Sequence, residues 1–509
     1  MATDTTTGLG AAPGPLARPW ALRRRLARVP VPLALILVVG AFLSVAWDVV
    51  TPAFQGPDEA KHFAYIQYFA ETGHLPNANG ASEATEPSLG STEEREALTY
   101  LDLRPLIGNR TERPAWTAPD LGLWHLLERS MPRGSRANGA NANAIAKNPP
   151  LYYAVMAIPY RVFIWLPVLK RVFVLRLVNS LFYLATIVLM WLLAGEVFGA
   201  VRWKQALATA VVALQSYLSS LGATINADNL LIALTTGFLL CAVRLVRRGP
   251  SLGRVLAPSA LAVAASLTHG RGLVTLPVLA VALAVAWITH RPAPRETLRL
   301  GGAALATVGV GLVAYTLFGK SSSSGGLYGG QVGELNTHTK FKVGQFLSTV
   351  WQFYLPKLPG FPTRLGPNFG YRQVFIQGFY GQGIFAPTVF KALQALSAIG
   401  LLGFCAAVVV RWRQLRRAWP IVVVMLALLV TTLAFLHYVS YRALLGNDTK
   451  QLIVGRYLLP MISLFGLAIA FTVGALPRRL APLAGGAILA GAVLLSITGI
   501  TTTLFRFYA

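Results

Sequence analysis

The stretch VPLALILVVGAFLSVAWDVV, residues 31–50, runs directly into TPAFQGPDEAKHFAYI, residues 51–66. A helix needs about 20 apolar residues to cross the hydrocarbon core of a bilayer, so residues 31–50 are predicted to span a membrane. Asp58 and Glu59 then lie where the chain leaves the bilayer. Because a charge close to a membrane core is costly and usually marks a site, these acids are the first functional candidates. The alternative is that they are interfacial acids solvated by headgroups and water.

The composition indicates a multipass membrane protein. Of the 509 residues, 54% are hydrophobic and 13% are charged, which excludes a single soluble core. The net charge of +26 does not indicate a nucleic-acid partner, because the arginines cluster in short turns between apolar spans. Both cysteines, Cys241 and Cys405, fall inside such spans, so an external disulfide, a thiol nucleophile and a cysteine metal site are not indicated.

Hydropathy predicts an all-α polytopic fold with eleven spans. A twelfth candidate, residues 149–169, is interrupted by Pro159, Arg161 and Pro167. If this segment lies outside as an interfacial helix, the basic turns are all cytosolic, as the positive-inside rule requires; if it spans, they all flip outside. The external position is therefore predicted. The spans are residues 31–50 and about 172–194, 204–222, 226–245, 253–269, 271–289, 299–318, 389–410, 418–439, 453–474 and 481–504.

This topology predicts a cytosolic amino terminus, an external carboxy terminus and three long external segments, residues 51–171, 319–388 and 440–452. The first of them carries 12 of the chain's 19 acids. Residues 1–30 are expected to be a disordered basic tail in the cytosol, and residues 31–509 a single transmembrane domain. Residues 341–355 place apolar side chains at helical spacing, which predicts an amphipathic helix on the outer leaflet or on the protein's own surface.

Five motifs follow one another in a specific order: PDEAKHFAY (57–65), NPPLYY (148–153), VLRLVNS (174–180), NAD (226–228) and GRYLLP (455–460). The series resembles the GT-C superfamily of polyprenyl-phosphate-sugar-dependent membrane glycosyltransferases. It is most similar to a bacterial family of predicted membrane proteins of unassigned function, related to the protein O-mannosyltransferases. The resemblance covers about residues 31–475.

The resemblance implies a GT-C-like bundle with external juxtamembrane helices. It also implies a plasma-membrane enzyme that moves a sugar from a polyprenyl phosphate to an acceptor hydroxyl on the extracytoplasmic face. Members often carry a large soluble carboxy-terminal domain, whereas this sequence ends five residues after its last span. Recognition of the acceptor, whether glycan, protein or lipid, is then expected to fall to the three external segments.

An acid in the first external loop of GT-C enzymes is the catalytic base or helps to bind a metal, and that role maps onto Asp58 and Glu59. Partial desolvation at the membrane edge raises the pKa of a carboxyl group toward the working range of a base. Asp58 is the predicted base, and Glu59 is predicted to orient Asp58, the acceptor or a metal. His62, four residues on, shares the helical face of Asp58 and is a substrate-binding candidate; otherwise it is a surface histidine.

The donor phosphate requires cations. Arg456 is the main candidate, because a guanidinium can hold two phosphate oxygens at once and Arg456 begins a span at the outer face. Tyr457 beside it is assigned to the same substrate site. Lys450 could assist, with Arg442 in the same loop, while His269 and Arg271 are weaker candidates between two spans. The alternative for each base is a side chain that snorkels to the interface.

A divalent cation is a further possibility. In bacterial oligosaccharyltransferases, acids of a later loop join the first-loop acid in holding a metal, whereas protein O-mannosyltransferases work without one. Asp58 and Asp228 could hold Mg²⁺ or Mn²⁺, because hard cations prefer oxygen ligands. No nucleotide-binding glycine loop occurs, so a cytosolic nucleotide sugar is not the expected donor.

The predicted function is a glycosyltransferase of the cell envelope. The alternative is a transporter or flippase for a polyprenyl-linked sugar, which would also need many spans, a lipid groove and phosphate-binding bases. A transporter would place ionisable groups near the bilayer midplane, whereas here the acids concentrate outside. A structural subunit of an envelope-assembly complex would leave Asp58 and Glu59 without a task.

Overall fold

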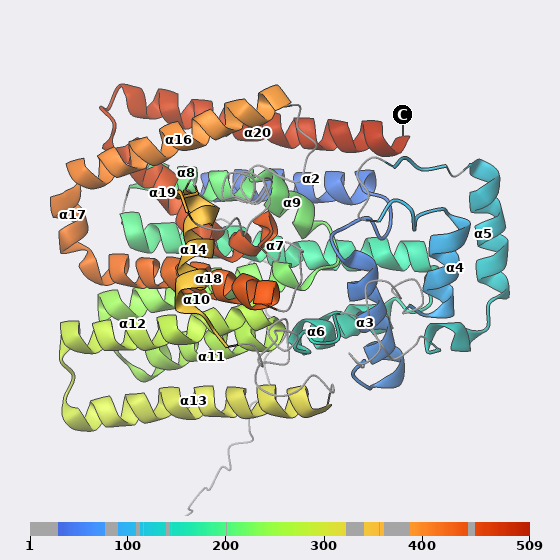
Figure 1. The fold of residues 1–509 in the computed structure, drawn as a ribbon, viewed down its shortest axis with the longest axis horizontal. Helices are drawn as coiled ribbons and strands as arrows, with labels where there is room; N and C mark the ends of the chain where they lie inside the picture. Colours follow the sequence, from blue (N-terminus) through green and yellow to red (C-terminus); the bar gives the residue numbers. More distant parts are fainter. Residues whose placement is uncertain are drawn as a thin grey trace, which may run out of the picture.

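A computed structural model describes residues 29–76, 90–107, 112–115, 117–138, 143, 145–199, 201–321, 340–355, 357–360, 387–445 and 453–508. These residues form helices and connecting turns (Figure 1). The amino-terminal half comprises α2 (Val31–Val50), α3 (Glu59–Thr72), α4 (Thr92–Tyr100), α5 (Ala118–Ser130), η2 (Arg133–Arg136), α6 (Leu151–Val162), α7 (Val168–Phe198), α8 (Arg202–Ala213), α9 (Ser216–Gly222) and α10 (Ala227–Arg248). The remainder comprises α11 (Leu252–Thr268), η3 (Gly270–Val274), α12 (Thr275–His290), α13 (Pro294–Ser321), α14 (Val343–Tyr354), α16 (Pro387–Val410), α17 (Trp412–Arg417), α18 (Trp419–Leu445), η4 (Gly455–Met461), α19 (Ile462–Ala475) and α20 (Leu480–Tyr508).

Nine helices of the described segments are long and apolar enough to cross a membrane, counting η3 with α12 and η4 with α19 as one helix each. They coincide with nine of the predicted spans. The other two predictions correspond to α11, a shorter apolar helix, and to α8 with α9. The expected all-helical membrane fold is therefore confirmed, with nine candidate spans among the described residues and helices at the places of the other two.

The prediction of one continuous helix over 204–222 differs from the structure, which breaks it between α8 and α9. The side chain of Gln215 accepts a hydrogen bond from the backbone N–H of Leu218 and so begins α9 anew. The break contains neither proline nor glycine, the usual sequence signals for an interruption. A capping side chain inside an otherwise apolar run explains why hydropathy did not reveal it.

The basic turns gather at one end of the bundle. Figure 1 shows α17, the α10–α11 turn and the α12–α13 turn at the end of the molecule opposite to α3, α4 and α5. In an antiparallel bundle every second connection lies at the same end, so the predicted topology requires the basic turns to gather in this way. Helix α6 has 12 residues, about 18 Å at 1.5 Å per residue, which is too short to span. It packs against α3 and α7, and its position outside the membrane stays a prediction.

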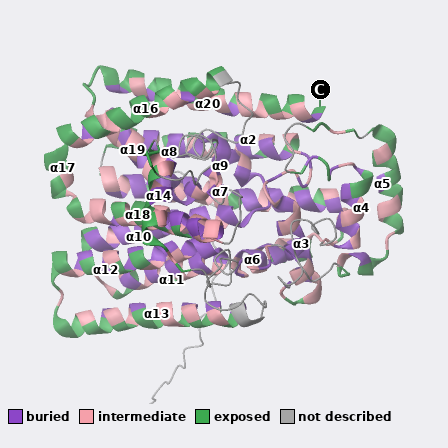
Figure 2. Cartoon of the chain, viewed as in Figure 1, coloured by how far each residue is buried: buried purple, intermediate pink, exposed green. Residues whose placement is uncertain are grey.

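The protein has two main apolar cores. One lies inside the bundle between α7, α8, α10, α12 and α19, and the second joins α3, α4, α6 and the start of α7. The end of the molecule that holds this second core is called the acid-rich end. Figure 2 shows buried residues concentrated in the middle of the molecule and exposed ones on α13, α16 and α20. The exposed surfaces of these outer helices carry Leu305, Ile399 and Leu483, as expected of lipid-facing helices.

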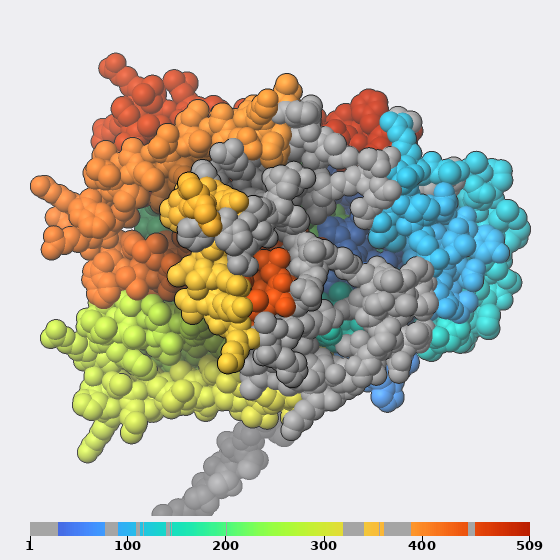
Figure 3. Space-filling model, viewed as in Figure 1, coloured from blue at the N-terminus to red at the C-terminus, as the bar shows by residue number. Residues whose placement is uncertain are grey.

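The predicted amphipathic helix is α14, which lies across the surface of the bundle beside the end of α18 (Figure 3). Its buried face places Phe353 against the bundle, and the Tyr354 hydroxyl lies 2.9 Å from Nε2 of His437 on α18. Val343 and Leu347 on its other face are about 60% exposed (61% and 59%). The helix therefore packs on the protein and still presents an apolar surface outward.

Candidate active site

The first external turn places Asp58 at the start of α3 in an uncommon conformation. Phe54 and Asp58 both have left-handed backbones, with φ angles of 65° and 55°. Such conformations cost energy for residues other than glycine and cluster at functional sites. Asp58 occupies the position before the helix, yet its carboxylate makes no capping bond there. Instead it binds Arg456 through Oδ2 and lies 3.3 Å from Nζ of Lys61 through Oδ1.

Asp58 is ionised and partly accessible. Its side chain is 27% exposed. Burial raises the pKa of Asp58, but the charges of Arg456, Lys61 and His62 together hold it well below its ordinary value. Both carboxylate oxygens face a cation, so this carboxylate is charged and reachable but not yet free to accept a proton.

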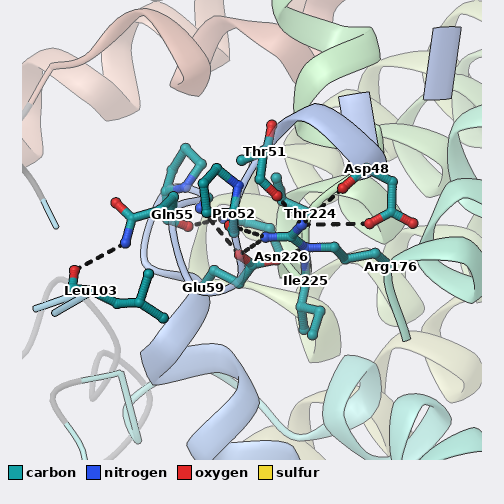
Figure 4. Close-up of polar contacts among 12 residues, drawn as sticks. Asp48, Thr51, Pro52, Gln55, Glu59, Leu103, Arg176, Thr224, Ile225 and Asn226 are labelled. Carbon is teal, nitrogen blue, oxygen red and sulfur yellow. Dashed lines mark hydrogen bonds and ion pairs between the residues drawn. The ribbon is translucent and has the colours of Figure 1, made fainter. Parts of the chain in front are cut away.

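Glu59, one residue on, has different surroundings. Its carboxylate receives two hydrogen bonds from Arg176, Nε to Oε1 at 2.7 Å and Nη2 to Oε2 at 2.6 Å (Figure 4). The backbone N–H groups of Gly56 and Ile225 donate to the same oxygens at 3.1 and 3.0 Å. Glu59 is 1% exposed. With every side of its carboxylate occupied, Glu59 is placed to hold the turn rather than to meet a substrate.

Arg176 completes this support. Besides Glu59 it donates to the carbonyl oxygens of Thr51 at 2.7 Å and Pro52 at 2.8 Å, and it lies 3.5 Å from Asp48 (Figure 4). The sequence motif VLRLVNS contains Arg176, but no role was assigned to it. A charged residue inside an apolar run was the available signal, because such residues are retained in a membrane only with partners.

A second ion pair lies close to the first. Asp228, at the start of α10, binds Nη2 of Arg271, and the same nitrogen lies 3.2 Å from Nε2 of His269. Asp228, His269 and Arg271 are all at most 5% exposed. Gly272 allows this arrangement, because a Cβ atom there would lie 2.0 Å from the carbonyl oxygen of Ala265.

Tyr457 joins the two ion pairs. The Cζ atom of Arg271 lies 4.1 Å from the centre of its ring, and that of Arg456 lies 5.4 Å from it. Cations over an aromatic ring are attracted by its electron density. Residues separated by almost 400 positions, Asp58 and Arg456, thus share one site with Asp228 and Arg271.

Two guanidinium groups of this site, those of Arg271 and Arg456, are only partly hydrogen-bonded. The buried Nε and Nη1 atoms of Arg271 and the buried Nε of Arg456 have no hydrogen-bond partner among the described residues. An unsatisfied buried donor is costly, more so on a charged group, and in a native protein it needs an explanation. These donors match an anion with several oxygen atoms, such as a phosphate.

The other predicted residues are placed as follows. His62 is buried beside Asp58 with its Nδ1 3.0 Å from the hydroxyl of Tyr153. Lys450 lies outside the described residues. Arg442 lies over the rings of Phe341 and Tyr438 on and near α18. Sequence reasoning missed Lys61, whose signal was its spacing of three residues from Asp58 on a helix.

The carboxylates do not form a suitable metal site. Asp58 and Asp228 each bind an arginine, and the described residues contain no group of three histidine, cysteine or acidic side chains placed to hold an ion. A divalent cation would have to displace both guanidinium groups against their charge. The donor set therefore fits an anion better than Mg²⁺ or Mn²⁺.

The sequence motifs converge on this site. The side chain of Asn226 caps the start of α10, where it accepts a hydrogen bond from the backbone N–H of Asp228. Its amide nitrogen also donates to the carbonyl of Pro57 at 2.8 Å. Asn179 of α7 donates to the carbonyl of Thr224 at 2.5 Å and accepts from the Tyr152 hydroxyl at 3.0 Å. Five segments far apart in the chain therefore surround the two ion pairs, Asp58 with Arg456 and Asp228 with Arg271.

The fold is similar to that of ArnT, a protein of known structure. The structure of ArnT from Cupriavidus metallidurans in the apo state matches this chain with a TM-score of 0.50 and 15% identity, over 94% of this chain and 65% of ArnT. ArnT bound to undecaprenyl phosphate gives a TM-score of 0.44 and 16% identity, over 93% and 65%. The oligosaccharyltransferase AglB from Archaeoglobus fulgidus, with an inhibitory peptide and a dolichol phosphate, gives 0.43 and 14%, over 93% and 55%.

The chain belongs to the DUF2142 family of predicted membrane proteins, whose model matches residues 41–465. This range contains all five motifs that meet at the site. No sequence among the curated proteins matches the chain. The chain spans 65% of the length of ArnT, and at 15% identity the likeness shows the fold alone.

Proposed function

We propose that this chain is a membrane glycosyltransferase that moves a sugar from a polyprenyl-phosphate donor to an acceptor hydroxyl. The observation that carries the proposal is the pairing of partly unsatisfied buried arginines, Arg271 and Arg456, with a reachable ionised carboxylate, Asp58. The first group suits a departing phosphate, and the second suits an attacking hydroxyl. ArnT, whose fold this chain shares, has also been solved with undecaprenyl phosphate bound.

The reaction assigns one task to each group. The acceptor oxygen attacks the anomeric carbon of the donor while its proton passes to Asp58. The bond between that carbon and the phosphate oxygen breaks, and the phosphate leaves with the bonding electrons. Arg456 and Arg271 stabilise the charge that develops on the phosphate. Each requirement of the transfer is thus met by a residue of the site.

Donor binding would also activate the base. In this structure Oδ2 of Asp58 is held by Arg456. A donor phosphate competes for the same guanidinium, and as Arg456 turns to the phosphate, one carboxylate oxygen becomes free. Weakening of the ion pair raises the pKa of Asp58 toward the range of an effective base. The donor is therefore expected to bind before the acceptor.

The site is assigned to the extracytoplasmic face, and the reaction is proposed to be metal-independent. Helix α3, which follows Asp58 directly, lies at the end of the bundle opposite to the basic turns (Figure 1), and basic turns favour the cytosol. Next to Tyr457, Leu458 and Ile453 form an apolar cluster with Phe353 of α14 that would suit the lipid portion of the donor. The protein is assigned to the plasma membrane on the same reasoning.

The test is transfer by the purified protein. It is incubated with a panel of polyprenyl-phosphate sugars and membrane-extracted acceptors, with and without a chelator, and labelled product is measured. We expect sugar transfer that survives chelation and disappears in Asp58→Asn. Movement of the lipid-linked sugar across liposomes without transfer would replace the enzyme by a transporter.

A further inference from the structure

The residues around His62 form a hydrogen-bond chain that the reaction above does not use. The side-chain nitrogen Nδ2 of Asn148 donates to the hydroxyl of Tyr153 at 3.1 Å. That hydroxyl lies 3.0 Å from Nδ1 of His62. The ring of Tyr65 stacks on Tyr153 with 3.5 Å between ring centres, which restrains the tyrosine. All four side chains are buried, and the two tyrosines belong to the apolar core at the acid-rich end.

The direction of this chain follows from hydrogen-bond counting. A tyrosine hydroxyl has one proton to donate, and the Tyr153 oxygen already receives an N–H from Asn148. Among the described residues, the acceptor within reach of the Tyr153 proton is Nδ1 of His62. A proton on Nδ1 would leave the buried hydroxyl hydrogen without an acceptor, which is costly. With the amide nitrogen of Asn148 on the tyrosine, as the structure has it, this count leaves Nδ1 without a proton.

We propose that Asn148 and Tyr153 hold His62 as the neutral tautomer with its proton on Nε2, so that the imidazole offers an N–H donor to a phosphate oxygen of the substrate. Asn148 and Tyr153 are then positioning residues, and His62 is a substrate-binding donor rather than a second base. The contact with phosphate rests on the proposed function, whereas the tautomer does not.

The charges that face His62 agree with a neutral ring. Burial lowers the pKa of His62 most, the carboxylates of Asp58 and Asp228 oppose this, and Arg456 and Lys61 add to it, with the result at about 4. The ring is thus uncharged at neutral pH. Among the described residues Nε2 forms no hydrogen bond, so its N–H is left for a ligand, and Asp58 and Arg456 are close enough to the ring to shift its pKa.

The test is nitrogen NMR of the full chain in lipid vesicles, with all histidine rings labelled with ¹⁵N. The signal of His62 is assigned by its loss in His62→Gln. In the donor-free protein we expect an unprotonated Nδ1 and a protonated Nε2 at neutral pH. A protonated Nδ1, or an imidazolium, would overturn the proposal, whatever the transfer assay shows.

Substitutions test the direction of the chain. Asn148→Asp replaces the N–H donor by a carboxylate that takes the Tyr153 proton, so the tautomer should reverse to Nδ1–H. Tyr153→Phe should remove the preference for one tautomer. The matched control is Tyr152→Phe, because the Tyr152 hydroxyl bonds Asn179 instead and should leave His62 unchanged. If both variants fold and His62 keeps its tautomer in each, the proposed hydrogen-bond chain does not set the tautomer.

The ligand contact is tested separately with polyprenyl phosphate that carries no sugar. Its addition should move the Nε2 resonance of His62. His62→Leu should weaken its binding by about 10- to 100-fold, the range of a hydrogen bond to a charged group, and His62→Gln should recover part of the loss because its amide can donate. No movement of the resonance would remove the phosphate contact, while the tautomer result would stand by itself.

Discussion

Helix α7 supplies one arginine to each of two pairs of adjacent acids, and the two pairs end in different charge states. Arg176 binds Glu59 and leaves Asp58 to Arg456. Arg171 binds Glu93 through both oxygens, at 3.0 and 3.1 Å, and leaves Glu94 buried with Oε2 unpartnered among the described residues. In both pairs the arginine of α7 neutralises one acid. The environment of the second acid decides whether it is charged.

The contrast separates burial from charge compensation. Burial raises the pKa of Glu94 to about 8, with the charge of Glu93 adding to it and Arg95 opposing, so Glu94 holds its proton at neutral pH. Asp58 is also partly buried, but cations lower its pKa below the ordinary value and it is ionised. A buried acid next to a second acid is therefore charged only where the fold supplies it with its own cation. Asp58 is such a case, and it faces the site.

The largest expected effect is on Asp58. Asp58→Asn keeps the size of the side chain and removes its basicity, so sugar transfer should fall by about 10² to 10⁴ fold, the usual contribution of positioned proton transfer. Donor binding should be retained or become tighter, because Arg456 loses a competing partner. Transfer at close to the wild-type rate in the folded variant would refute Asp58 as the base.

Glu59→Gln should act on stability instead. It removes the closest carboxylate from the buried Arg176, and breaking one side of a buried ion pair costs about 3–5 kcal/mol. Thermal unfolding in detergent, compared with Asp58→Asn under the same conditions, measures the difference. If Glu59→Gln unfolds like the wild type and yet abolishes transfer, the roles assigned to the two adjacent acids are reversed.

Arg456→Ala and Arg271→Ala should each weaken donor binding by about 10- to 100-fold, from the loss of hydrogen bonds to a charged phosphate. Arg456→Lys should recover only part of the affinity, because an ammonium lacks the two-pronged geometry of a guanidinium. Arg442→Ala is the matched control, since Arg442 contacts the rings of Phe341 and Tyr438. Normal donor affinity in both variants of the site would exclude the proposed phosphate contacts.

The smallest effect on sugar transfer is expected for Glu94→Gln, which acts on stability. Folded Glu94 keeps its proton up to about pH 8, whereas an unfolded glutamate loses it near pH 4.3. Its contribution to stability is fully present below about pH 4.3 and is lost as the pH rises through about 8. The variant should therefore become more stable than the wild type when both are heated at pH 9. Equal loss of stability in both proteins between pH 7 and pH 9 would show that Glu94 ionises normally.

Much of the architecture and part of the site could be predicted from the sequence. The spanning segments were predictable because lipid forces each crossing to satisfy its backbone within one long apolar helix, a local property. Asp58 and Arg456 were predictable as candidates, because charges at a membrane boundary stand out from such runs. The orientation in the membrane and the roles of these residues stay predictions.

The pairing of charges was decided by the tertiary structure alone. Asp58 and Glu59 look equivalent in the sequence, and Arg176, Arg271 and Arg456 lie in three separate segments. A left-handed residue at Asp58 turns adjacent carboxylates toward different arginines, and the break between α8 and α9 depends on one capping side chain, Gln215. Hydropathy depends on each residue's own transfer energy, whereas an ion pair depends on the distance between two groups, which exists only once the helices have packed.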